Sequence, residues 1–63
     1  MNEALLIDRL AEIGARLAIL RADATAARNA AMQAQLVYVA ATFKDFGAEL
    51  EAIEKLIVEA ARV

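Results

Sequence analysis

The sequence predicts an all-α protein: a helical hairpin of two antiparallel helices that self-associates into a four-helix-type bundle. Hydrophobic residues make up 62% of the chain, proline is absent and alanine is the most frequent residue. Alanine, leucine, glutamate, arginine and lysine lose the least free energy on entering a helix. Large apolar side chains recur at steps of three and four, the spacing of helices that pack lengthwise. These observations together indicate amphipathic helices and exclude a disordered tail.

The first apolar stripe predicts a helix over about residues 3–21. Asn2 is a suitable N-cap, and Glu3 would be favourable in the first turn because of the helix dipole. The stripe consists of Leu6, Leu10, Ile13, Leu17 and Leu20.

The segment 21–35 interrupts this pattern, because Met32 is its only large apolar side chain. Asp23 or Thr25 could cap a new helix, and Asn29 could end one in a left-handed conformation. We therefore expect a turn within about residues 22–30.

A second stripe predicts a helix over about residues 30–62, so that residues 1–63 form a single helical domain. The stripe begins at Leu36, and its phase is offset by two positions from the first stripe, which favours a break between them. A three-helix bundle is the alternative, with a second break near Thr42 and Gly47. The stripe continues through Val39, Phe43, Phe46, Leu50, Ile53 and Ile57.

Further apolar residues lie off both stripes, and one hairpin contact cannot bury them all. They are Leu5, Ile7, Ile19, Val37, Leu56 and Val58. A 63-residue chain without cysteine or histidine has no disulfide and no usual zinc site to stabilise a small core. We therefore expect a homodimer, with some of this surface left for a different protein.

The predicted interface for self-association or for a partner combines the two stripes with one further aromatic residue. Tyr38 is added because its hydroxyl group needs water or a partner, which suits the edge of an interface. The set is Leu6, Leu10, Ile13, Leu17, Leu20, Leu36, Tyr38, Val39, Phe43, Phe46, Leu50, Ile53 and Ile57.

Catalysis, cofactor binding and metal binding have little support in the composition. Histidine, cysteine and serine are all absent, so the common nucleophiles and proton shuttles are missing. We expect no enzyme, no cofactor and no metal. No apolar run approaches the roughly 20 residues of a membrane span, and we find no secretory signal, so a cytoplasmic protein is expected.

The expected function is that of a non-enzymatic protein–protein interaction module, such as an adaptor, an inhibitor or a chaperone-like regulator, acting as a homodimer. A nucleic-acid-binding helical dimer is the first alternative, with contacts from Arg21, Arg28 and Lys44. A net charge of −2 disfavours it, because phosphate binding needs a basic surface. A purely structural or designed bundle is the second alternative.

Overall fold

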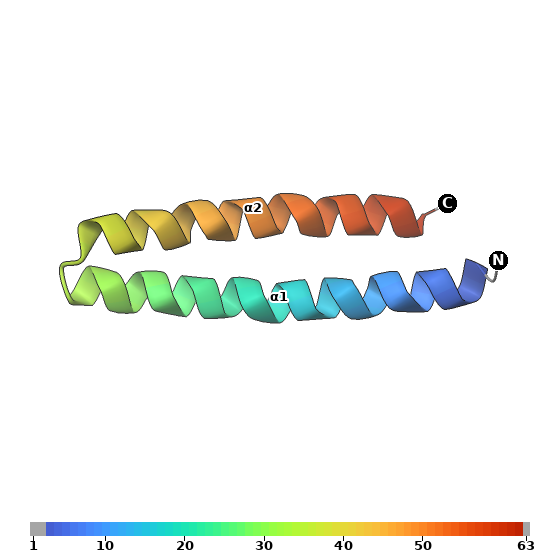
Figure 1. The fold of residues 1–63 in the computed structure, drawn as a ribbon, viewed down its shortest axis with the longest axis horizontal. Helices are drawn as coiled ribbons and strands as arrows, with labels where there is room; N and C mark the ends of the chain where they lie inside the picture. Colours follow the sequence, from blue (N-terminus) through green and yellow to red (C-terminus); the bar gives the residue numbers. More distant parts are fainter. Residues whose placement is uncertain (1–2, 63) are drawn as a thin grey trace.

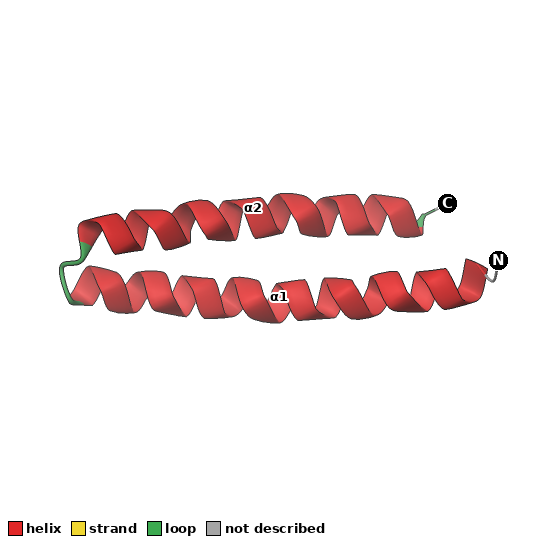
Figure 2. Cartoon of the chain, viewed as in Figure 1, coloured by secondary structure: helices red, strands yellow, loops and turns green. Residues whose placement is uncertain are grey.

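The computed structural model describes residues 3–62 and confirms the helical hairpin. Helix α1 spans Glu3–Gln33 and helix α2 spans Val37–Ala61. The two helices run antiparallel along their length, and a short connection over residues 34–36 joins them (Figures 1 and 2). The molecule is a rod, with extents of 50 × 14 × 13 Å.

The two helices differ in length, so one end of the rod is uneven. Helix α1 begins and α2 ends at the same end of the rod, and the first turns of α1 extend beyond the end of α2 (Figure 1). Leu6 and Ile7 lie in these first turns and remain exposed. Asn2, the expected N-cap, lies outside the described residues.

The connection lies at residues 34–36, so the turn expected within 22–30 was placed too early. Gln35 has a φ of 62°, in the left-handed region. Its N–H donates to the carbonyl of Met32 at 3.0 Å, and the N–H of Leu36 donates to the carbonyl of Ala31 at 2.8 Å. This pair of bonds is the Schellman motif, which satisfies the last carbonyl groups of a helix.

The segment 21–35 is helical through Gln33, contrary to the expected break. Its alanines are the best helix formers, so the lack of large apolar residues does not end the helix. Ala24 and Ala31 are buried against α2, where small side chains let the two backbones approach closely. Thr25 caps nothing, because its hydroxyl donates to the carbonyl of Arg21 four residues earlier.

Helix α2 is continuous, so the three-helix alternative is wrong. Thr42 does not start a new helix, since its hydroxyl donates at 2.9 Å to the carbonyl of Tyr38 within the same helix. Gly47 lies inside α2 without breaking it. The helix begins after Leu36, which occupies the N-cap position without a side-chain hydrogen bond.

Candidate interaction surface

The contact between the two helices is narrow and is built around one row of residues on each helix, the central rows. Ala24, Ala31 and Leu50 are buried there, and the other members are partly buried. The residues of each row are seven positions apart, so they lie on one face of their helix. The central rows are Leu10, Leu17, Ala24 and Ala31 of α1 and Phe43, Leu50 and Ile57 of α2.

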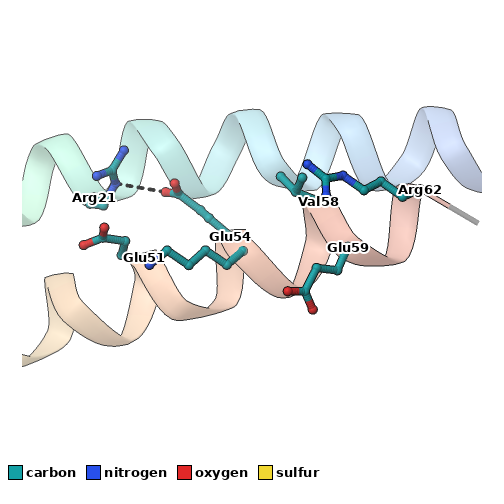
Figure 3. Close-up of a pocket in the computed structure, with 7 residues that line it drawn as sticks. Arg21, Glu51, Glu54, Val58, Glu59 and Arg62 are labelled. Carbon is teal, nitrogen blue, oxygen red and sulfur yellow. Dashed lines mark hydrogen bonds and ion pairs between the residues drawn. The ribbon is translucent and has the colours of Figure 1, made fainter.

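One side of the central rows is lined by small and charged residues, which we call the polar flank. Each of its members lies four residues after, or three before, a central residue. Arg21 and Glu54 join the two helices here, with 3.1 Å between Nε and Oε1 (Figure 3). The polar flank consists of Gly14, Arg21 and Arg28 of α1 and Ala40, Gly47, Glu54 and Ala61 of α2.

The structure brings Arg21, Arg28 and Lys44 together, as the nucleic-acid alternative requires. They line one depression of about 230 Å³ on the polar flank, but Glu51 lines it too. Arg28 donates from Nη2 to the side chain of Asn29 at 3.0 Å, while its buried Nε has no partner among the described residues. The basic character of this depression is therefore partly offset by Glu51 and by the Arg21–Glu54 pair.

The opposite side of the central rows is apolar and only half covered. Its members lie four residues before, or three after, a central residue in both helices. In an antiparallel pair such positions share one side, and the Arg21–Glu54 contact fixes the polar flank on the other. Its large side chains are between 37% and 46% exposed. We call Leu6, Ile13, Leu20, Val39, Phe46 and Ile53 the apolar face.

A second exposed apolar surface lies where the chain reverses direction. We call Met32, Leu36, Val37 and Tyr38 the hairpin tip. Tyr38 is 90% exposed and Val37 is 73% exposed. Met32 and Val37 line a depression of about 460 Å³, and Leu36 and Tyr38 line another of about 390 Å³.

The predicted interface residues thus divide among three places. The central rows hold Leu10, Leu17, Phe43, Leu50 and Ile57, which pack within one chain. The apolar face holds six others, and the hairpin tip holds Leu36 and Tyr38. Two tip residues, Met32 and Val37, were absent from the predicted set; the signal for them was their position beside the turn, which was expected elsewhere.

A group of metal ligands and a membrane-spanning helix are both absent from the described part of the chain. Within residues 3–62, no three carboxylate, cysteine or histidine groups are close enough to hold a metal ion. Neither α1 nor α2 is both long enough and apolar enough to cross a bilayer.

Comparisons with known protein families, with curated proteins and with solved structures find no match to this chain. The exposed apolar surfaces are therefore the feature on which a function can be argued.

Proposed function

We propose that this protein is a non-enzymatic protein–protein interaction module that acts as a homodimer in the cytoplasm. The observation that supports it is the exposure of large apolar side chains over most of the rod. Fifteen large hydrophobic residues would be expected to lie mostly inside a self-sufficient domain, yet here they are exposed. Contiguous apolar surface of this kind marks interaction sites in soluble proteins.

The hairpin tip is the part of the surface that we assign to a different protein. Its side chains project at one end of the rod, where two depressions adjoin them. Tyr38 supplies a rigid aromatic ring with a polar end, the kind of side chain that is enriched at binding hot spots. An adaptor, an inhibitor and a chaperone-like regulator would all bind in this way.

The test uses two substitutions at the hairpin tip in a protein purified with its partner from the source cell. Tyr38→Ala removes the ring, and Leu36→Asp removes an apolar side chain while providing the carboxylate that the N-cap of α2 lacks. We expect both variants to stay helical by circular dichroism and to lose the partner.

The matched control is Ile19→Ala, which removes exposed apolar surface from α1 away from the tip. It should keep the partner. Retention of the partner by Tyr38→Ala and Leu36→Asp would refute the assignment of the tip.

Nucleic-acid binding is a second candidate because Arg21, Arg28 and Lys44 line one depression. It predicts an affinity for RNA or DNA that falls steeply with salt and is abolished by Arg21→Glu with Arg28→Glu. The control is Arg9→Glu with Arg16→Glu, which makes the same change of charge on α1 away from that depression. Equal losses in both double variants would count against a specific site.

A further inference from the structure

We infer that the apolar face is covered by a second copy of this chain, packed face to face to make a four-helix bundle. This rests on the proposed function and deepens it, because it assigns the two apolar surfaces to different partners. The apolar face takes the second copy, and the hairpin tip takes the foreign protein.

The first support is the amount of surface that the single chain exposes. A compact monomer of 6.8 kDa would expose about 4,000 Å². This chain exposes 5067 Å². The excess of about 1,000 Å² is close to the area of about 800 Å² that each partner buries in a standard interface.

The second support is the shape of the molecule. Its radius of gyration is 14.8 Å, against about 11 Å for a compact domain of this length. A side of 50 by 14 Å gives each chain a face of about 700 Å². A second rod laid along this side therefore supplies an interface of the required size and a thicker, more compact body.

The third support is the pattern of the face, which specifies a helical occupant of the same length. The residues of the apolar face recur every seven positions on both helices, as in helices that pack lengthwise over several turns. Ala27 and Ala60 continue the same two rows with small side chains. Small side chains next to large ones leave room for side chains of the facing copy to interdigitate.

The polar flank does not offer a comparable interface. Covering it would remove Arg21 and Arg28 from water, and burial of charged groups is costly unless each is paired. The Arg21–Glu54 pair and the depression of Figure 3, lined by Lys55, Glu59 and Arg62 among others, therefore remain on the outside of the bundle.

The test is sedimentation equilibrium on the purified protein without any partner. Leu20→Glu places a charge on the apolar face, whereas Ile19→Glu makes the same change at the neighbouring residue, which is 65% exposed on the other side of α1. We expect the wild type and Ile19→Glu to be dimers, and the dimer of Leu20→Glu to be weaker by about 100-fold or more.

A milder pair of variants keeps the test decisive if Leu20→Glu fails to fold. Ile53→Ala shortens a side chain of the apolar face, and Val58→Ala shortens an exposed one outside it. We expect about tenfold weaker dimerisation for Ile53→Ala and no change for Val58→Ala. Either of two results overturns the inference: a folded wild-type monomer at about 100 µM, or equal effects of the face variants and their controls.

The failure of this inference can be told apart from the failure of the proposed function. A monomer that still loses its partner through Tyr38→Ala would refute this inference and the homodimeric state, but would leave the binding of a different protein at the hairpin tip standing. A dimer that passes the sedimentation test but binds its partner regardless of Tyr38 and Leu36 would leave this inference standing and refute the assignment of the hairpin tip.

Discussion

At the scale of single residues, the reversal of the chain depends on Gln35, whose φ of 62° is unusual for a residue with a side chain. Glycine is the common residue at this position of a Schellman motif, because it lacks the Cβ atom that clashes in the left-handed region. Glutamine there gives no recognisable signal in the sequence. The turn was therefore expected near Asp23, Thr25 or Asn29. These residue types are common at helix ends, but all three lie inside α1.

Gln35→Gly should stabilise the protein by about 0.5–1 kcal/mol, because it relieves the left-handed strain of a residue with a Cβ atom. The matched control is Gln33→Gly at the last position of α1, which should lower the free energy of unfolding, because glycine disfavours the helix. Urea unfolding followed by circular dichroism measures both changes. A loss of stability in Gln35→Gly would contradict the assigned role of this residue.

Gly47→Ala should raise the free energy of unfolding by about 1 kcal/mol, the difference in helix propensity between the two residues. A Cβ atom at Gly47 would meet nothing within 4 Å, so the added methyl group has room. Ala48→Gly, at the next position of α2, should cost about the same amount. Thermal unfolding of the two variants checks the prediction. A loss of stability in Gly47→Ala would show that atoms outside the hairpin lie in close contact with this position.

At the scale of the helices, the apolar stripes and the contact between α1 and α2 are related but not identical. The predicted stripes combine the central rows with the apolar face. The hairpin instead closes over the central rows and the polar flank, where Gly14 and Ala40 are small. The apolar stripe of each helix is thus rotated partly out of the hairpin contact.

This rotation explains how much the sequence could predict. Periodicity predicted two helices and a hairpin, because large apolar residues such as Leu17 and Leu50 mark a helical face. It could not tell which side of that face α2 covers, since the contact depends on small residues that carry no hydrophobic signal. Residues 22–30 are alanine-rich and were predicted to hold the turn for the same reason.

The Arg21–Glu54 pair should contribute modestly to the association of α1 with α2. Its arginine is about half exposed and its glutamate is mostly buried, so the pair is only partly screened by water. In a double-mutant cycle with Arg21→Met and Glu54→Leu, we expect a coupling of about 0.5–1 kcal/mol in the free energy of unfolding.

The exposed pair Glu12–Arg16 within α1 is the control for that cycle, since its two charges are 2.6 Å apart but well solvated. Its coupling should be smaller, at about 0.3 kcal/mol. Equal couplings for the two pairs would show that the cross-helix contact adds nothing beyond a surface ion pair.

At the scale of the whole molecule, few residues are buried for the length of chain that must be ordered. Ala24, Ala31, Ala40 and Leu50 are the buried residues of the described chain. Three of them are alanines, which bury little area. Ordering costs on the order of 1.5 kcal/mol per residue, so we expect a chain with so small an interior to need additional contacts for its stability.

Stability should therefore depend on protein concentration. If folding is coupled to dimerisation, the Tm should rise as the concentration is raised, because mass action favours the associated state. Calorimetry over a hundredfold range of concentration measures this. A Tm that stays constant, with a cooperative transition, would show that one hairpin is stable alone.

The antiparallel arrangement of the two helices decides where a label can be attached to this protein. Since Glu3 and Ala61 lie towards the same end of the rod and the chain reversal lies at the other, a fluorophore or affinity tag attached beyond either residue stands at the opposite end of the rod from Tyr38. Labelled protein can consequently report on occupancy of the distant end without obstructing it.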